Sequence, residues 1–368
     1  MIFLEVRPAR DAQAAARRRW SRIVPMRAHS SPLVIGHRGA SGYRPEHTAA
    51  AYKLAFALGA DAVEPDIVAT RDGVLVLRHE SEISTTTDVA QHPEFASLRT
   101  TKVVDGLHVT GWFTEDFTWA QLSTLRARER LGALRQASRS FDDQFPILRM
   151  ADLFKIVDEA AAASGRQLGI VAEIKHATYF ESLGLPLDEL FAAELAEAGW
   201  GDERERLVVE SFERTVLGKL HMRGVRGTRV YLIEESGSPF DEVAAHGSAA
   251  RSYADEITEA GLYALASAPA ATRVDGVSVN KSMILNAGTS WNQPAANDLV
   301  DLVHAAGLEA YCWTLRPENR FLTKGLRVGR DAAAFGDWQR EYRIIMETGV
   351  DGVFADQPDL AIAVRDTL

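Results

Sequence analysis

The sequence predicts an α/β fold, a TIM (β/α)8 barrel of eight parallel strands with a small insertion after the second strand. Two observations support this prediction. Short apolar segments alternate along the chain with longer Ala- and Leu-rich segments of helical character, and this alternation is typical of a parallel barrel. The chain has 368 residues, of which 46% are apolar and 25% charged, an ordinary globular composition and enough for one barrel with an insertion.

The expected elements follow one another regularly. The expected strands are 33–37, 61–67, 168–173, 207–211, 229–233, 274–279, 308–313 and 351–354. The expected helices between them include 48–58, 149–163, 186–198, 213–222, 296–306 and 338–347. Eight strands that alternate with helices are the number that a closed barrel needs.

A ninth apolar segment, 74–79, does not fit this alternation. It follows Thr70-Arg71-Asp72-Gly73, which has the composition of a tight turn. Because so short a connection cannot make a parallel crossover, we expect an antiparallel strand above the barrel mouth rather than in its wall. Residues 80–147 then form one insertion. A structureless loop of that length would be unusual, so we expect a small subdomain.

Charged residues gather where the first two strands end, and barrel enzymes build their active sites at the carboxyl ends of the strands. Glu64 and Asp66 lie two residues apart in an otherwise apolar strand, so their side chains share one face. Burying such charges without a partner is costly, and a metal or a cationic group would remove that cost. His37 ends the first strand, and the hairpin should bring His79 beside the two acids.

Later strands end on residues of similar kinds. Glu173 and Lys175 follow an apolar run at the end of the third strand, and their spacing points both side chains the same way. Phe212 ends the fourth strand and Trp313 the seventh. A surface ion pair is the alternative interpretation of Glu173 and Lys175, and core packing is the alternative for Trp313.

Taken together, these motifs resemble the glycerophosphodiester phosphodiesterase family in order and spacing. The matching segments are His37-Arg38-Gly39, Pro45-Glu46-His47-Thr48, Glu64-x-Asp66, His79, Glu173-Ile174-Lys175, Ser211-Phe212, Trp313-Thr314 and the run from Asp351 to Pro358. Residues 111–118 are similar to the inserted segment of the long bacterial and plant branch. The resemblance covers roughly residues 32 to 364. It implies a single phosphodiesterase domain over 32–368, of the phospholipase-C-like barrel type, with an insertion subdomain over 80–147.

The resemblance implies an enzyme that hydrolyses a small glycerophosphodiester to sn-glycerol 3-phosphate and an alcohol with the help of a metal. A phosphodiester is an anion, and a divalent metal reduces its resistance to nucleophilic attack. Glu64, Asp66 and Glu173 would supply three oxygen ligands. An all-oxygen set suits Ca²⁺ or Mg²⁺ better than zinc, and the choice between the two ions stays open.

The family pattern also implies roles for the remaining candidates. His37 and His79 would be the general acid and base, in either order, although His79 could instead be a fourth metal ligand. Arg38 and Lys175 would bind the phosphate. The nucleophile could be water or the neighbouring hydroxyl group of the glycerol, which would give a cyclic phosphate that water then opens.

Specificity for the alcohol would then lie in the insertion and in Phe212 and Trp313. An apolar wall discriminates between such groups by only about 1–3 kcal/mol, so we expect broad tolerance of the alcohol and a strict requirement for the glycerol phosphate half.

Glu46 could hold Arg38 through a salt bridge, and His47 is interpreted as a structural residue at the start of a helix.

Two other functions remain open from the sequence. One is a phospholipase-D-like enzyme of the same barrel superfamily that acts on lysophospholipid or sphingomyelin. In that case the aromatic residues of the insertion, Trp112, Phe113, Phe117 and Trp119, could line a groove for the acyl chain. The other is a non-catalytic module that binds phospholipid head groups. It would require the loss of a metal ligand or a histidine, and none is missing.

Composition excludes several other classes of protein. The net charge of −10 argues against a nucleic-acid partner, and no apolar run approaches the eighteen residues of a membrane span. The single cysteine, Cys312, excludes an internal disulfide and is expected in the core.

Positive charge is concentrated in two segments. Residues 1–31 are expected to be an extension whose arginines lie at positions 7, 10, 17, 18, 19, 22 and 27. This segment lacks the apolar core of a secretory signal, so we expect a cytoplasmic protein, although the branch it resembles leaves an extracytoplasmic location open. The loop 314–337 carries five more basic residues and would be either a solvated loop or a surface that attracts an anionic substrate.

Overall fold

The computed structural model describes residues 31–286 and 294–368. Residues 31–368 form one compact unit. The predicted Arg-rich extension, apart from Ser31, lies outside the described residues. Within the described ranges, no helix has both the length and the apolar character needed to cross a lipid bilayer.

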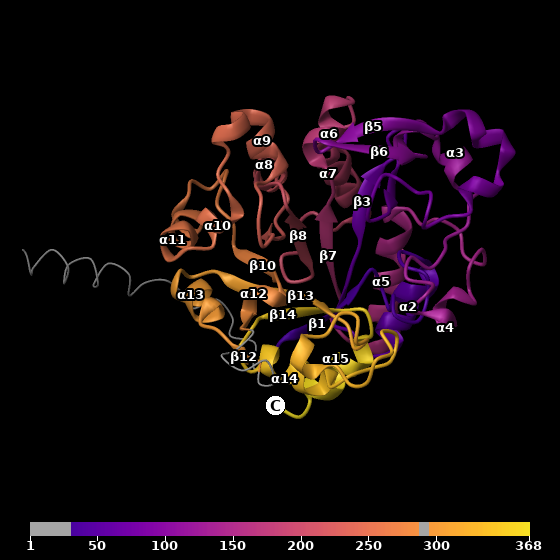
Figure 1. The fold of residues 1–368 in the computed structure, drawn as a ribbon. Helices are drawn as coiled ribbons and strands as arrows, with labels where there is room; N and C mark the ends of the chain where they lie inside the picture. The colour runs from indigo at the N-terminus through magenta and orange to yellow at the C-terminus, as the bar shows by residue number, and fades with distance from the viewer. Residues whose placement is uncertain (1–30, 287–293) are drawn as a thin grey trace, which may run out of the picture. The chain divides into compact units, whose positions relative to one another are not determined.

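In the described part of the chain, eight parallel strands close into a barrel, as the sequence predicts (Figure 1). They are β1 (Leu33–His37), β2 (Ala62–Glu64) with its continuation β3 (Asp66–Ala69), β7 (Gly169–Ile174), β8 (Leu207–Ser211), β9 (Thr228–Ile233), β10 (Gly276–Asn280), β13 (Glu309–Leu315) and β14 (Gly352–Ala355). The ring closes because β1 pairs with both β14 and β2, and because β2 and β3 pair with β7. The carboxyl ends of all these strands therefore meet at one end of the barrel.

The second barrel strand is divided at Pro65, where the sequence predicts one continuous strand over 61–67. Proline has no N–H to donate to the sheet, so the strand is interrupted there. The carbonyl oxygen of Pro65 still accepts a hydrogen bond from the backbone N–H of Glu173 at 2.9 Å, which holds the strand against β7. Glu64 and Asp66 consequently flank the break at the carboxyl end of this strand.

Helices surround the barrel (Figure 1). Those that the sequence predicts are α2 (Ala49–Ala57), α5 (Met150–Ser164), α7 (Leu187–Ala198), α8 (Arg214–Met222), α13 (Leu299–Ala305) and α14 (Trp338–Met346). Further helices are α6 (Ala177–Ser182), α9 (Phe240–His246), α10 (Tyr253–Glu256), α11 (Glu259–Ser267), α12 (Lys281–Ile284) and α15 (Pro358–Arg365), with one-turn 3₁₀ helices η4 (Gly247–Ala249) and η5 (Lys324–Leu326). The buried Tyr342, Ile345 and Met346 of α14 show the spacing by which such helices pack on the barrel.

Two apolar clusters fill the two sides of the barrel wall. The inner cluster takes residues from six strands: Ile35, Ala62, Val171, Val230, Tyr311 and Phe354. The larger outer cluster lies between the strands and the helices. Cys312, next to Tyr311 on β13, is fully buried in the outer cluster because successive residues of a strand face opposite sides, so the prediction of a core cysteine is confirmed.

The predicted hairpin is confirmed: β4 (Leu75–Leu77) pairs antiparallel with β3, and Gly73 has a positive φ of 77° in the turn. Among the described strands β4 pairs only with β3, so it lies outside the closed ring. The insertion that follows contains β5 (Thr100–Val104), β6 (Leu107–Gly111), α3 (Trp119–Leu122), α4 (Gln136–Arg139) and the 3₁₀ helices η1 (Val89–Gln91), η2 (Pro93–Leu98) and η3 (Thr114–Asp116). Its buried side chains join the outer cluster of the barrel.

One helix begins later than the sequence predicts. Residues 296–306 were expected to be helical, but α13 starts at Leu299. The preceding Ala295–Ala296 is a short strand, β12, that pairs antiparallel with β11 (Leu285–Asn286). Pairing with a segment ten residues earlier in the chain therefore keeps this stretch extended, which local helical spacing does not reveal.

Candidate active site

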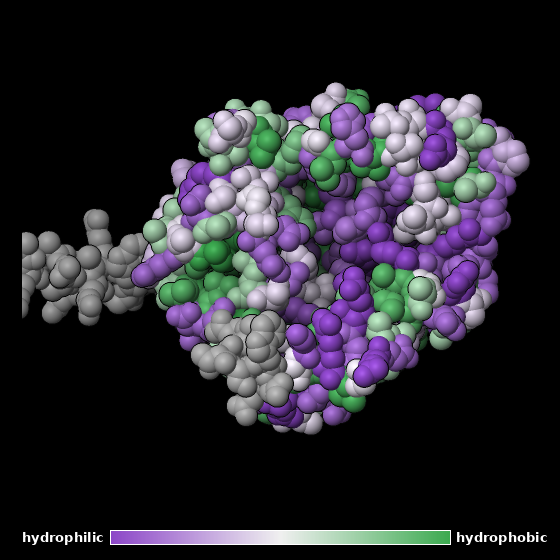
Figure 2. Space-filling view, viewed as in Figure 1, coloured by the Kyte–Doolittle hydropathy of each residue, from purple (hydrophilic) through white to green (hydrophobic). Residues whose placement is uncertain are grey.

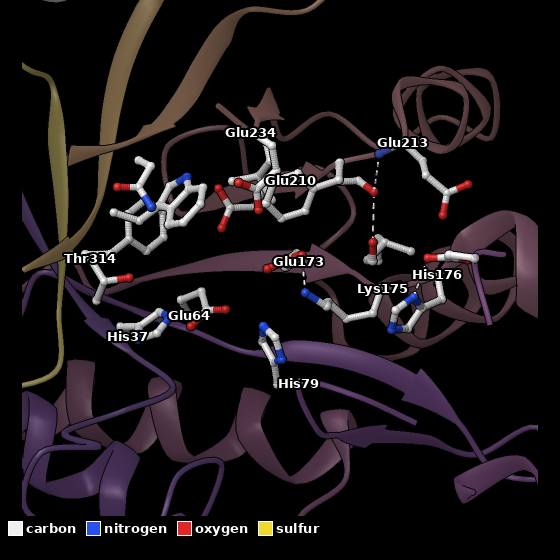
Figure 3. Close-up of a pocket in the computed structure, with 18 of the residues that line it drawn as sticks. His37, Glu64, His79, Glu173, Lys175, His176, Glu210, Glu213, Glu234 and Thr314 are labelled. Atoms are coloured by element: carbon white, nitrogen blue, oxygen red, sulfur yellow. Dashed lines mark hydrogen bonds and ion pairs between the residues drawn. The ribbon is translucent and has the colours of Figure 1, made fainter. Parts of the chain in front are cut away.

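A cavity of about 1010 Å³ lies at the carboxyl ends of the barrel strands. Figure 2 shows it as a hollow in the centre of the molecule with strongly hydrophilic residues on its wall. Eight of the predicted site residues line it: His37, Arg38, Glu64, His79, Glu173, Lys175, Phe212 and Trp313. Figure 3 labels His37, Glu64, His79, Glu173 and Lys175 among them. The ninth, Asp66, is completely buried directly beneath the wall, where it contacts Arg38. The structure thus brings all the predicted site residues together.

Three carboxylates form the base of the site. Glu64, Asp66 and Glu173 each present an oxygen within 4.8 Å of the others, and Asp66 and Glu173 are paired neighbours on β3 and β7. All three side chains are buried. Burial and the charge of Asp66 raise the pKa of Glu64 well above its usual value, and burial raises the pKa of Glu173 to about 8. Carboxylates crowded in this way need a cation to stay ionised.

Asp66 shows most directly that the group fits a metal ion. Its Oδ2 atom is contacted by Nε2 of His47 at 2.9 Å and by Nε of Arg38 at 3.2 Å. Its Oδ1 atom is buried and has no hydrogen-bond partner among the described residues. A buried carboxylate oxygen beside two further acids is the kind of ligand that Ca²⁺ and Mg²⁺ take.

Arg38 is held by acids on two sides. Its Nη1 atom donates to Oε2 of Glu46 at 3.1 Å, so the salt bridge expected from the sequence is present. Its backbone N–H donates to Oε2 of Glu64 at 2.7 Å. Because Arg38 has a positive φ of 59°, the backbone turns sharply after β1, and both its N–H and its side chain reach the acids.

Lys175 and His47 both contact the acids of this group. Nζ of Lys175 lies 2.7 Å from Oε1 of Glu173 and 3.9 Å from Asp66, and it is on the cavity wall. His47 is buried, with Nδ1 at 2.7 Å from the hydroxyl of Tyr52 and Nε2 on Asp66. Its contacts are therefore structural, as the sequence suggests, and they fix the position of Asp66.

Each of the two candidate histidines is hydrogen-bonded to a carboxylate through Nδ1. The partner of His37 is Oδ1 of Asp356 at 2.6 Å, and that of His79 is Oε1 of Glu80 at 2.5 Å. This leaves Nε2 as the ring nitrogen available for proton transfer. Burial, and after it the nearby Arg38, lower the pKa of His37 to about 4 and that of His79 to about 3. His79 is not part of the carboxylate group that could hold a metal.

Two further acids of the site were not assigned a role from the sequence. Asp356, after β14, is buried and orients His37. Glu210, on β8, is buried on the cavity wall beside Glu173, and its Oε2 has no hydrogen-bond partner among the described residues. The sequence contains a signal for Glu210: it is a single acid within an apolar strand, and the same signal pointed to Glu64.

Of the basic loop after β13, Arg316 and Arg320 line the cavity, whereas its other basic residues do not. Nε of Arg316 lies 2.7 Å from Oδ2 of Asp356. Two members of the loop therefore carry positive charge to the site, which agrees with attraction of an anion rather than with a wholly solvated loop.

The suggestion that the aromatic residues of the insertion line a groove for an acyl chain is wrong. Phe113 and Phe117 are completely buried in the outer cluster, and the Trp112 indole N–H donates to the carbonyl of Phe95 at 2.7 Å. Trp119 packs under the guanidinium of Arg149. None of these four aromatic residues is on the cavity wall. The insertion reaches the wall instead through residues 105–107, the tip of the β5–β6 hairpin.

Comparison with known proteins agrees with this geometry. Residues 37–360 match the model of the glycerophosphoryl diester phosphodiesterase family. The chain is 30% identical to glycerophosphodiester phosphodiesterase GDPD6 of Arabidopsis thaliana over 349 residues, which cover 89% of this chain and 84% of the plant protein. It is 26% identical to the glycerophosphodiester phosphodiesterase of Haemophilus influenzae over 199 residues, 52% of each chain.

Solved structures show the same fold. The glycerophosphodiester phosphodiesterase of Agrobacterium tumefaciens superposes with a TM-score of 0.54 at 16% identity, over 90% of this chain and 99% of that one. A phosphodiesterase from Oleispira antarctica superposes with a TM-score of 0.54 at 18% identity, over 91% and 97%. With the family match over most of the barrel and the motif residues assembled in one cavity, the chain is an enzyme of the glycerophosphoryl diester phosphodiesterase family, which hydrolyses glycerophosphodiesters.

Proposed function

We propose that the cavity hydrolyses a small, water-soluble glycerophosphodiester to sn-glycerol 3-phosphate and an alcohol, with Ca²⁺ or Mg²⁺ held by Glu64, Asp66 and Glu173. The observation that carries this proposal is the convergence of three buried carboxylates and two histidines on one cavity. A bound divalent cation would neutralise charge on the phosphodiester and so favour attack at phosphorus. The Oleispira antarctica structure, described as a complex with the product sn-glycerol-3-phosphate, supports this choice of substrate.

Lys175 and Arg38 bind and orient the phosphate in this proposal. Lys175 is the more direct of the two, because its ammonium lies on the wall between Glu173 and the Phe212 ring, 5.6 Å from the ring centroid. Arg38 keeps its guanidinium on Glu46 and Asp66 and adds positive charge next to the metal site. A planar guanidinium and a point ammonium together hold an anionic tetrahedral group from two directions.

His37 and His79 transfer the protons. One ring takes the proton of the nucleophile through Nε2, and the other gives a proton to the alkoxide that leaves. Asp356 and Glu80 hold the two rings through Nδ1, which fixes the tautomer and the direction of each Nε2. The same pair of rings serves whether water or the neighbouring glycerol hydroxyl attacks, and a cyclic phosphate detected by ³¹P NMR during turnover distinguishes the second route.

A direct assay tests the proposed function. Purified protein should release sn-glycerol 3-phosphate from glycerophosphocholine in the presence of Ca²⁺ or Mg²⁺ and should lose this activity in chelator. Lysophosphatidylcholine should be a poorer substrate, since the aromatic side chains of the insertion are packed in the core and offer no chain-binding groove. Faster turnover of lysophosphatidylcholine would favour the phospholipase-D-like alternative, and binding of head groups without turnover would favour the non-catalytic one.

Trp313 should contribute to substrate binding more than to the chemical step. Its ring packs edge-on against Phe212, with 5.9 Å between the ring centroids, and both line the cavity. We expect Trp313→Ala to raise KM for glycerophosphocholine about tenfold and to lower kcat less, because an apolar wall contributes about 1–3 kcal/mol of binding. Trp119→Ala, outside the cavity, is the control and should leave KM unchanged. A fall in kcat larger than the rise in KM would contradict this role.

A further inference from the structure

We propose that the insertion after the second barrel strand positions both active-site histidines through two of its arginines, Arg130 and Arg135. This inference rests on the proposed function of His37 and His79. It gives the insertion a role in addition to the selection of the alcohol expected from the sequence.

The first chain of contacts runs from Arg135 to His37. Nη2 of Arg135 lies 2.6 Å from Oδ2 of Asp356, whose Oδ1 contacts the His37 ring at 2.6 Å. Arg135 is itself fixed, because its Nε donates to Glu318 at 2.7 Å and its side chain is only 5% exposed. The Asp356 carboxylate therefore cannot rotate away from His37 without breaking a buried ion pair.

The second chain of contacts runs from Arg130 to His79. Its Nη1 and Nη2 atoms donate to the two carboxylate oxygens of Glu80 at 2.9 and 2.5 Å, and Oε1 of Glu80 holds His79. The same guanidinium also donates to both oxygens of Glu46, from Nε at 3.0 Å and from Nη2 at 2.8 Å. Glu46 in turn holds Arg38. One arginine of the insertion thus fixes the partner of His79 and the partner of Arg38 together.

Both arginines belong to one short segment of the insertion. Just before this segment, Arg126 forms an isolated β-bridge with Pro146, and Ala127 forms one with Thr87. These bridges tie the start of the segment to the rest of the insertion. A histidine that is oriented by a carboxylate keeps one tautomer, and an arginine that is itself held by a second acid restricts the rotation of that carboxylate. Removal of Arg135 should therefore disturb proton transfer while the phosphate and metal contacts remain. Removal of Arg130 should disturb proton transfer and also loosen Glu46, the partner of Arg38.

Variants Arg130→Lys and Arg135→Lys test this role. Lysine keeps the charge but has no planar fork, so it cannot bind both oxygens of Glu80 as Arg130 does or join Asp356 to Glu318 as Arg135 does. We expect kcat for glycerophosphocholine to fall about 10- to 100-fold in each, with metal affinity unchanged. KM should stay within about threefold of wild type in Arg135→Lys and rise further in Arg130→Lys, because Arg130 also holds Glu46, the partner of Arg38. In ¹⁵N NMR spectra, the His37 ring in Arg135→Lys and the His79 ring in Arg130→Lys should exchange between two tautomers. In the wild type each ring should keep one tautomer.

The matched control is Arg128→Lys, because Arg128 makes a bidentate contact with Asp143 in the same insertion, at 2.6 and 2.8 Å, away from the cavity. It should keep wild-type kcat. Unchanged kcat in both test variants, or a loss shared equally by kcat, metal affinity and Tm, would overturn the inference. A wild-type protein without any activity would instead refute the proposed function.

A separate observation, at the other end of the cavity, concerns the alcohol. We infer that this end binds an alcohol that carries an ammonium group. The inference again rests on the proposed function, because it names the class of substrate that the same cavity prefers.

Two acids at this end lack a partner for one oxygen. Glu213 is buried; its Oε2 accepts hydrogen bonds from the N–H and the hydroxyl of Thr178, and its Oε1 has no hydrogen-bond partner among the described residues. Asp105, on the hairpin tip, contacts Nδ1 of His176 at 2.6 Å with one oxygen, and its other oxygen is buried without a partner in the described part of the chain. Both acids line the cavity, and Figure 3 shows Glu213 and His176 beyond Lys175, away from His37.

Aromatic rings complete this end of the cavity. Phe212 packs edge-on against Tyr253, and Phe240 of α9 lies next to the hairpin tip, where a Cβ atom on Gly106 would be 3.9 Å from its ring. All of these residues line the cavity. Aromatic faces combined with buried carboxylates are the surroundings in which proteins bind primary and quaternary ammonium groups.

Substrate comparison tests the inference. The wild-type protein should hydrolyse glycerophosphocholine and glycerophosphoethanolamine with kcat/KM values about 10- to 100-fold above that for glycerophosphoglycerol, whose alcohol is neutral. Glu213→Gln and Asp105→Asn should each lower this ratio several-fold and leave kcat/KM for glycerophosphoglycerol unchanged. Glu181→Gln is the control, because this acid pairs with Lys219 outside the cavity.

Equal kcat/KM for charged and neutral alcohols in the wild type would overturn the inference while leaving the proposed function intact. So would variants that slow all three substrates by the same factor. Failure to hydrolyse any of the three esters would refute the proposed function itself.

Discussion

Asp66→Ala should abolish glycerophosphodiester hydrolysis and greatly weaken binding of Ca²⁺ or Mg²⁺. Asp66 presents an oxygen within 4.8 Å of both other acids, and its buried Oδ1 lacks a hydrogen-bond partner among the described residues. Its removal leaves two carboxylates, too few to compensate for dehydration of the ion. Glu64→Ala and Glu173→Ala should have the same effect on activity, since each removes one ligand from the set.

Metal binding can be measured without turnover. An ion that binds only the folded protein stabilises it by about 2.7 kcal/mol at a concentration of 100 times its Kd, so Ca²⁺ or Mg²⁺ should raise the Tm of the wild type. This increase should disappear in Asp66→Ala. It should also disappear in Asp66→Asn, which has nearly the shape of aspartate and therefore preserves the packing around His47 and Arg38 better than alanine does. Asp188→Asn, a buried acid that pairs with Arg223 on the outside of the barrel, should behave as wild type. Full activity of Asp66→Ala in saturating chelator would refute the metal site.

His37→Ala and His79→Ala should each lower kcat by roughly 10² to 10⁴, the usual effect of losing a general acid or base. Both rings act in one reaction, so the double variant should lose less than the product of the two single losses. Stopped-assay measurement of glycerol phosphate release at saturating substrate gives these values.

The metal titration decides between the two roles considered for His79. If His79→Ala loses activity but retains the Tm increase with metal, the residue transfers a proton; if both are lost, it is a ligand. His92→Ala is the control, because this histidine of the insertion contacts Asp88 and Glu94 outside the cavity. Activity above about a third of wild type in either His37→Ala or His79→Ala would rule out an essential proton-transfer role for that ring.

Much of the fold could be predicted because each barrel strand is an apolar segment that is buried on both faces. That pattern is local, and it located seven of the eight parallel strands within two residues. The differences arise where distant residues or backbone chemistry decide. Pro65 divides the second strand, and pairing with Leu285–Asn286 delays the start of α13.

Much of the candidate site could also be predicted, because its signals are local in the sequence. Acids such as Glu64 and Glu173 stand at the ends of apolar strands, and the barrel topology alone brings those ends together. Glu210 carries the same signal and was missed, because its neighbours Ser211 and Phe212 were the residues that resembled a motif. The role of Asp356 could not be predicted in this way, because it depends on the His37 ring, which lies 319 residues earlier in the chain.

The sequence by itself determined the barrel, the hairpin after its second strand and the set of acids, histidines and cations that meet at the strand ends. Only the tertiary structure decided what the insertion does at the site. Its aromatic side chains, conspicuous in the sequence, are packed in the core, whereas Arg130 and Arg135 reach acids 50 and 221 residues away. No local pattern specifies such pairs, because an ion pair forms wherever the folded chain brings opposite charges together in a buried place, whatever their separation in sequence.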